Sequence, residues 1–240
     1  MAILDFLFPK KCLGCGRTGS YFCSQCLNFV SPSSERICPV CERPSIDGLT
    51  HPRCRSATSL DGLTSLFVYK GLIKKAIIKL KYRFVSDLAT DLVELLVSFC
   101  GEDKTFSSLC REKQFVLVPI PLHPRRERWR GFNQAELLGK MIAENLGINF
   151  SPDLLLRVKN TSPQIKLGEK ERKINIKDAF SLNYSIAQLS GKARFCSTGL
   201  NHSNILLFDD VWTSGVTLKE ACRTLKKSGA KMVWGLTLAK

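Results

Sequence analysis

The 240-residue sequence has no long hydrophobic stretch. Lys, Asp or Pro interrupts the apolar runs within about ten residues, whereas a transmembrane helix needs ~20. The first residues also lack the basic n-region and the long apolar segment of a signal peptide. We therefore expect a cytoplasmic protein without a transmembrane segment, whose N-terminal residues form a short docking helix.

Acidic residues are scarce relative to basic ones, and no low-complexity tract is present. Hydrophobic residues make up 44% of the chain, which is enough for a globular core and excludes a disordered protein. The 36 basic and 21 acidic side chains give a net charge of +15. The basic residues gather at 70–83, 125–130 and 157–173. Such charge attracts nucleic acid, phosphorylated small molecules or a lipid surface, and does not by itself choose among them.

Seven thiols and one imidazole within the first 54 residues form four pairs with two intervening residues each. Zinc prefers tetrahedral sulfur and nitrogen coordination, so eight donors predict two structural zinc sites that replace a hydrophobic core. A disulfide framework would need an oxidising compartment, which nothing else indicates. The shortest loops result from sequential pairing, although cross-braced pairing remains open. The predicted ligands are Cys12, Cys15, Cys23 and Cys26 for one site and Cys38, Cys41, His51 and Cys54 for the other.

Cys100, Cys110, Cys196 and Cys222 lie scattered through the rest of the chain. Core packing explains these four cysteines, because free cysteine behaves as a small hydrophobic residue.

Two adjacent carboxylates, Asp209 and Asp210, follow an apolar run at 204–208 that is typical of a buried parallel strand. A hydroxyl-rich turn and a helix over 218–228 come next, and a helix N-terminus binds phosphate well. Neighbouring sugar hydroxyls can donate to both carboxylates, so the pattern predicts a phosphosugar site. The alternative is an ordinary turn with a capping acid, which explains only one of the two carboxylates. The predicted turn residues are Thr213, Ser214, Gly215, Val216 and Thr217.

An arginine-rich segment follows a predicted strand at 115–120. Prolines stiffen its start, so we expect a rigid loop over 122–134 and then a helix over 134–145. Arginine beside aromatic rings suits phosphates and stacked bases, which predicts a nucleic-acid surface. His123 is a candidate general base, but a histidine between prolines is more often a loop residue. The predicted nucleic-acid residues are Arg125, Arg126, Arg128, Trp129 and Arg130.

The remaining segments predict a strand at 66–69, helices at 72–82 and 87–99, and a short strand at 179–182. The first helix carries a basic face, for which a solvated surface is the simpler explanation. The polar stretch 160–173 has the character of a mobile loop.

Several of these features together resemble the ComF family of bacterial competence proteins and their relative GntX over nearly the whole chain. They are the paired cysteines, the Leu80-Lys-Tyr82 helix end, the segment from Val118 to Gln134, and the stretch Ser162-Pro-Gln164 to Phe180 before the Asp-Asp motif. The sequence departs from the family at His51, where cysteine is more usual, and at Trp212 and Ser214, where Tyr and Thr are commoner.

The resemblance implies an α/β fold, a double zinc ribbon at 1–60 followed by a type I phosphoribosyltransferase-like parallel sheet with flanking helices at 61–240. It also implies that Asp209 and Asp210 hold the ribose hydroxyls of phosphoribosyl pyrophosphate (PRPP). In this arrangement residues 213–217 would bind the 5′-phosphate, and Mg²⁺ would lie on the ligand's oxygens.

Two functions are consistent with this resemblance. The first is an accessory of DNA uptake that binds single-stranded DNA and PRPP, works with a helicase-like ATPase, and is cytoplasmic or peripheral at the inner membrane. The second is an active phosphoribosyltransferase that acts on a base or another nucleophile. We favour binding, because the sequence outlines neither an acceptor pocket nor a convincing proton acceptor. A purely structural zinc adaptor would leave Asp209 and Asp210 unexplained.

Overall fold

The protein is an α/β structure built on a five-stranded parallel sheet in the order β1-β7-β6-β2-β3. The computed structural model describes residues 9–82, 86–161, 168–183, 185, 200 and 203–240. No helix in these ranges is both long and apolar enough to cross a membrane. The strands are β1 (Gly62–Phe67), β2 (Val116–Pro119), β3 (Asn149–Phe150), β6 (Asn204–Val211) and β7 (Met232–Ala239).

Strand β6 lies at the centre of the sheet, where it pairs with β2 on one side and β7 on the other. Its residues from Ile205 to Phe208 are buried, as expected for a strand covered on both faces. Leu206 and Phe208 enter one core cluster and Ile205 and Leu207 the other, which follows from the alternation of side chains along a strand. The strand continues to Val211 and is still paired with β7 there, so Asp209 and Asp210 lie within the strand rather than after it.

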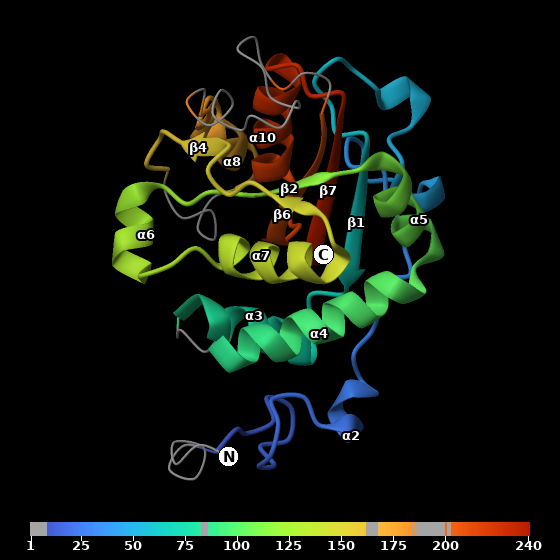
Figure 1. The fold of residues 1–240 in the computed structure, drawn as a ribbon, viewed down its shortest axis with the longest axis vertical. Helices are drawn as coiled ribbons and strands as arrows, with labels where there is room; N and C mark the ends of the chain where they lie inside the picture. Colours follow the sequence, from blue (N-terminus) through green and yellow to red (C-terminus); the bar gives the residue numbers. More distant parts are fainter. Residues whose placement is uncertain (1–8, 83–85, 162–167, 184, 186–199, 201–202) are drawn as a thin grey trace.

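Helices cover both faces of the sheet (Figure 1). One face carries α3 (Gly71–Tyr82), α4 (Ser86–Glu102) and α7 (Gln134–Leu146), and α5 (Lys104–Lys113) follows at the end of α4. The other carries α10 (Val216–Lys227) and α8 (Glu169–Ile176). A separate antiparallel pair, β4 (Leu155–Arg157) and β5 (Phe180–Leu182), lies beside α10. These elements confirm the predicted fold class.

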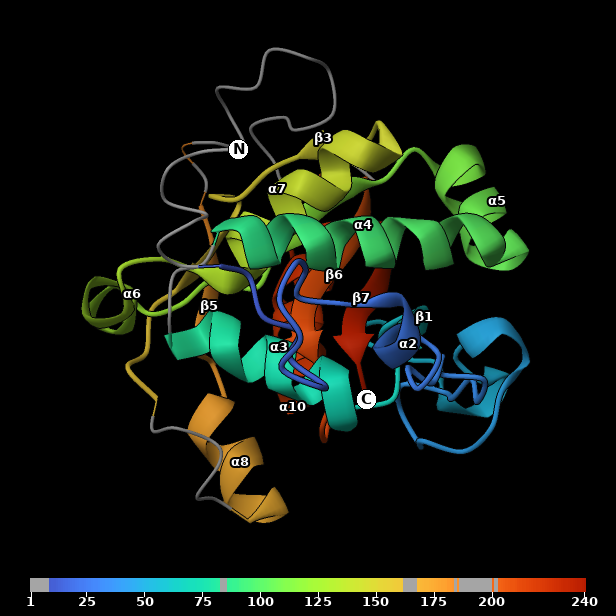
Figure 2. The same cartoon turned by 90° about the horizontal axis from the view of Figure 1, so that it is seen from below.

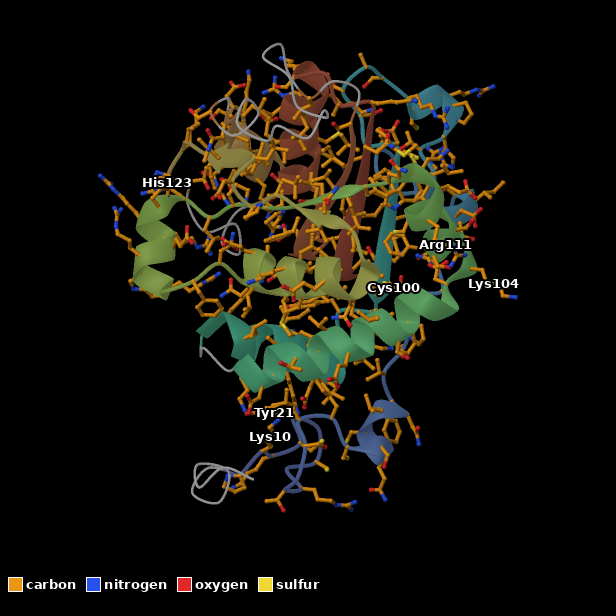
Figure 3. The ribbon with its side chains drawn as sticks, in the orientation of Figure 1. Lys10, Tyr21, Cys100, Lys104, Arg111 and His123 are labelled. Carbon is orange, nitrogen blue, oxygen red and sulfur yellow. The ribbon has the colours of Figure 1, made fainter. Side chains whose placement is uncertain are left out.

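The segment 122–134, predicted as a loop, contains a helix instead, α6 (Pro124–Arg130). Proline at its first position fixes a helical φ, and His123 Nδ1 accepts a bond from Arg125 N at 3.3 Å. Gly131 ends the helix at φ +86°. The prediction of a loop was therefore wrong, and His123 is a capping residue in this structure. It lies at the start of α6 (Figure 3).

The other predicted elements appear with shifted ends. The strand at 66–69 is β1 and begins at Gly62, and the helices at 72–82 and 87–99 are α3 and α4. Strand β7 and helix α5 were not predicted. The expected N-terminal docking helix, the last residue of the basic stretch 70–83 and residues 162–167 of the expected mobile loop lie outside the described residues. Residues 169–173 of that loop belong to α8.

The cysteine-rich N-terminal part packs directly on the sheet domain. The linker within this part, residues 31–33, runs along the outer edge of β1. There Ser33 N donates to Leu66 O at 2.7 Å, and Val68 N donates to Ser31 O at 3.1 Å. The side chain of Ile37 is buried in a core cluster that also contains β6 residues. The N-terminal part therefore covers the edge of the sheet.

Candidate functional site

The eight predicted zinc ligands form two compact clusters. In each, one donor atom from each residue lies within 4.8 Å of all the others. The groups are the ones that sequential pairing predicts: a first zinc unit (residues 12–26) and a second zinc unit (residues 38–54). Four donors fill a tetrahedral shell, which fits structural zinc. The members are Cys12, Cys15, Cys23 and Cys26, and Cys38, Cys41, His51 and Cys54.

Backbone amides favour the thiolate at the first cysteine of each unit. Burial opposes ionisation of Cys12, but hydrogen bonds from the N–H groups of Cys15, Cys23 and Gly14 outweigh it and lower the pKa of Cys12 to about 6. Burial likewise opposes ionisation of Cys38, yet backbone N–H groups lower the pKa of its thiol. Thiolate is the form that zinc binds.

His51 fits the second cluster as a nitrogen ligand. Its Nδ1 lies 3.4 Å from Cys41 Sγ, and its Nε2 lies 3.1 Å from the carbonyl oxygen of Pro44. A carbonyl accepts only from a protonated nitrogen, so Nε2 carries the proton and Nδ1 keeps its lone pair for a metal. The histidine that stands in place of the usual cysteine is therefore suitably oriented.

The two units contact different parts of the molecule. The first lies against α3 and α4 (Figure 2), where Lys75 Nζ donates to Leu13 O at 3.1 Å and the Lys79 ammonium lies 4.8 Å from the centre of the Tyr21 ring. Lys10, just before this unit, lies 3.5 Å from Asp87 and 3.8 Å from Asp91. The second approaches α5 and α10. Their effects on the rest of the protein can therefore be separated by mutation.

A cavity of about 210 Å³, here called the anion cavity, opens at the carboxyl end of β6. The Asp-Asp pair lines it together with residues of the turn 213–217, here named the phosphate loop after its predicted role, and with basic side chains from distant segments. Five cationic side chains and two carboxylates line it, so its charge favours an anion. The lining residues include Lys81, Arg126, Arg130, Arg157, Arg172, Asp209, Asp210, Thr213, Gly215, Val216 and Thr217.

The two carboxylates have different environments. Burial, and then the neighbouring charge of Asp210, raises the pKa of Asp209 to about 7. Asp210 forms an ion pair with Lys81, whose Nζ lies 2.6 Å from its Oδ2. Asp209 Oδ1 accepts a bond from the backbone N–H of Asp210 at 2.9 Å. A ligand that donates hydrogen bonds would offset the cost of ionising Asp209 in this setting.

The phosphate loop turns sharply over the ring of Trp212. Gly215 has φ +64°, and a Cβ at this position would lie 2.2 Å from the Trp212 ring. Glycine is therefore required by the backbone conformation and by the ring, rather than only by the close approach of a ligand. The side-chain oxygen of Ser214 is buried and has no hydrogen-bond partner among the described residues, and Ser214 is not one of the residues that line the anion cavity.

Arg157 is a lining residue that sequence reasoning missed. It is the last residue of β4, and only 9% of it is exposed. Its guanidinium carbon lies 5.6 Å from the centre of the Phe180 ring, and the guanidinium donates to Thr161 Oγ1. Its Nε is buried without a partner in the described part of the chain. Burial, and then the charge of Arg126, lowers the pKa of Arg157 to about 10. A buried guanidinium beside another cation indicates a place for an anion.

Helix α6 divides the predicted nucleic-acid residues between its two faces. Arg126 and Arg130 line the anion cavity, and Arg130 also donates to Gln134 Oε1. Arg125, Arg128 and Trp129 are exposed, with 75% of the Trp129 surface open to solvent. The outer face of α6 (Arg125, Arg128 and Trp129) thus remains a candidate nucleic-acid surface, whereas the inner arginines lie beside the Asp-Asp pair.

Comparison with known proteins gives consistent matches. A double zinc ribbon domain model matches residues 3–55. Competence protein ComFC of Bacillus subtilis (strain 168) is 30% identical over 215 residues, which cover 86% of this chain and 78% of that protein. Competence protein F of Haemophilus influenzae is 36% identical over 126 residues, 52% of this chain and 50% of that protein. DNA utilization protein YhgH of Escherichia coli (strain K12) is 27% identical over 213 residues, 88% of this chain and 86% of that protein.

Proposed function

Since the chain belongs to the ComF family, we propose that it is an accessory protein of DNA uptake that binds PRPP in the anion cavity and single-stranded DNA on the outer face of α6. The names of its relatives, competence protein and DNA utilization protein, support the role in DNA uptake. A helicase-like ATPase is the partner that the family resemblance implies. Peripheral contact with the inner membrane belongs to the same proposal.

The anion cavity carries the PRPP part of the proposal. It unites a carboxylate pair for a sugar diol, a helix-start loop for a monophosphate, and a group of arginines for a second anionic group. PRPP has these three features in one molecule. Mg²⁺ would bind the pyrophosphate and ribose oxygens, with the carboxylates of Asp209 and Asp210 nearby, and would supply charge neutralisation.

Isothermal titration calorimetry with PRPP and Mg²⁺ tests this assignment. We expect wild-type binding, and loss of binding in the double variant Asp209→Ala, Asp210→Ala with the fold retained by circular dichroism. Ribose 5-phosphate should bind more tightly than 2-deoxyribose 5-phosphate, because the deoxy sugar leaves one carboxylate contact unmade. Equal affinity of the double variant and the wild type would rule out the site.

The outer face of α6 carries the DNA part of the proposal. Arg125 and Arg128 can neutralise phosphates, and Trp129 offers an exposed ring for a base. Contacts to DNA phosphates and stacking on a base both show little sequence preference. Each neutralised phosphate contributes about −0.7 to the log–log salt slope of single-strand binding, so two such contacts should contribute about −1.4.

Fluorescence anisotropy with a labelled oligonucleotide tests the DNA surface. Arg125→Glu with Arg128→Glu should flatten the salt slope, whereas Trp129→Ala should cost roughly 1–3 kcal/mol and keep the slope. The matched control is Lys104→Glu with Arg111→Glu on α5, at the other end of the molecule from His123 (Figure 3). If the control pair lowers affinity as much as the α6 pair, binding does not involve this face.

One observation favours the alternative, an active phosphoribosyltransferase. A carboxyl whose pKa is near 7, as burial and Asp210 produce at Asp209, can accept a proton at neutral pH. The acceptor nitrogen would bond to ribose C1, pyrophosphate would leave C1 with the bonding electrons, and the acceptor's proton would pass to Asp209. Incubation of ³²P-labelled PRPP with bases and with single-stranded DNA tests this reaction by pyrophosphate release.

A further inference from the structure

Lys219, on the first turn of α10, joins the phosphate loop to the second zinc unit. Its Nζ donates to the carbonyl oxygen of Ser214 at 3.2 Å and to Glu42 Oε1 at 3.0 Å. The same ammonium lies 5.2 Å from the centre of the Trp212 ring, on which Gly215 rests. A single side chain therefore contacts the loop backbone, the ring beneath the loop and an acid from the zinc unit.

The zinc knuckle itself holds Glu42 in place. Glu42 directly follows the ligand Cys41, and its backbone has φ +61°. Its N–H donates to Cys38 O at 2.8 Å, and the N–H of Cys38 donates to Arg43 O at 2.9 Å. These two bonds close the turn that carries both cysteine ligands, so the position of Glu42 depends on the geometry of the metal site.

The phosphate loop depends on such support because its backbone must be oriented before a ligand arrives. Loop N–H groups bind phosphate only when they point into the cavity, and holding them there beforehand lowers the entropic cost of binding. The bond from Lys219 to the Ser214 carbonyl turns that peptide's oxygen toward α10. The first zinc unit has a different contact, through the carbonyl oxygen of Leu13, which accepts a bond from Lys75 Nζ on α3 at 3.1 Å.

We infer that the second zinc unit, through Glu42 and Lys219, holds the phosphate loop in its anion-binding conformation, so that zinc at the second site and a phosphosugar at the loop stabilise each other. The first zinc unit has no such effect. Lys219 is a positioning residue in this scheme, since it acts through the Ser214 backbone. The inference rests on the proposed PRPP site and adds a regulatory role for one of its two zinc ions.

Matched glutamine variants test the link by calorimetry. The Glu42–Lys219 pair is partly exposed, with 43% and 32% of the two side chains open, and such pairs contribute little energy. Glu42→Gln should therefore weaken PRPP binding roughly two- to fivefold. Glu35→Gln is the control, because Glu35 lies in the same segment and contacts Lys240 instead. Equal affinities of the two variants would overturn the inference.

Lys219 variants separate positioning from packing. Lys219→Met removes both hydrogen bonds and should weaken PRPP binding about tenfold, whereas Lys219→Arg keeps a cationic donor and should restore most of the affinity. Thermal midpoints should be similar for all these variants. A midpoint that falls in parallel with affinity would show a purely structural role and contradict the inference.

Coupling between sites is reciprocal, which supplies a test that needs no loop variant. PRPP should slow the release of one zinc ion of two to a chromogenic chelator, and Cys54→Ser should abolish the protected fraction while Cys26→Ser leaves it. Equal protection of both ions, or of neither, would overturn the inference.

The link can also be judged without PRPP. Hydrogen exchange at residues 213–217 should be faster in Glu42→Gln than in Glu35→Gln, and equal rates would overturn the inference even if wild-type protein bound no PRPP. In that case the absence of binding would refute the proposed function separately.

Discussion

Replacement of Arg157 by methionine should raise stability and lower ligand affinity at the same time. Burial and the charge of Arg126 lower the pKa of Arg157 from 12.5 to about 10, and each unit corresponds to about 1.4 kcal/mol. Holding the charged side chain in place therefore costs roughly 3 kcal/mol in the ligand-free protein. The bond to Thr161 and the stacking on Phe180 offset part of this cost, each by about 1 kcal/mol.

A net gain of about 1–2 kcal/mol remains, because methionine can fill much of the same space without a charge. For a chain of this size the thermal midpoint should rise by about 2–8 °C. The PRPP affinity should fall roughly 10- to 100-fold, since a charge-assisted hydrogen bond to phosphate contributes about 1.5–3 kcal/mol. The two effects have opposite signs, which distinguishes this prediction from ordinary loss of packing.

Differential scanning fluorimetry at pH 7.5, with and without PRPP and Mg²⁺, measures both quantities, and calorimetry gives the affinity directly. Arg125→Met is the control, because Arg125 lies on the outer face of α6 and should change neither the midpoint nor PRPP binding. A lower midpoint of the ligand-free Arg157→Met protein, or unchanged affinity, would refute the reasoning that an uncompensated guanidinium lines the cavity.

Three further outcomes are expected. Metal analysis should give two zinc ions per chain, and disulfides mapped among the eight ligands would contradict this. Gly215→Ala should lower the free energy of unfolding by roughly 2–4 kcal/mol in urea titrations, because of the positive φ and the contact with Trp212. The control is Gly147→Ala, at φ +63° with no atom within 4 Å of the added Cβ, which should cost only about 1–2 kcal/mol. Because the folded protein raises the pKa of Asp209 to about 7, it retains a proton that the unfolded chain has lost, and stability should fall as pH rises from about 4 to 7. Asp209→Asn should remove this fall, which urea midpoints at pH 5 and pH 8 would show.

Features that depend on short stretches of sequence were predictable. The spacing of paired cysteines gave both zinc clusters, since ligand pairs two residues apart define a knuckle locally. The apolar run before Asp209 similarly indicated the central strand, because burial on both faces leaves a continuous hydrophobic segment. These signals do not require knowledge of distant contacts.

Features created by tertiary contacts were not predictable. Arg157 and Lys81 enter the anion cavity from segments far from Asp209 in the chain, and single arginines and lysines carry no periodic signal. The segment 122–134 was mistaken for a loop because its prolines suggested stiffness, although proline is also favoured at the first position of a helix such as α6. A helical reading would have placed Arg126 and Arg130 on one face, four residues apart.

The linker along β1 has a consequence for the sheet domain when the N-terminal part is removed. An uncovered parallel strand presents unpaired N–H and C=O groups that can recruit another copy of the sheet. Residues 31–33 occupy this position at β1, and the opposite edge strand, β3, has only two residues. A protein cut before Asp61 would lose Ile37 from its core and expose the whole length of β1. Such a fragment should aggregate rather than remain monomeric, so the sheet domain depends on the N-terminal part to stay dispersed.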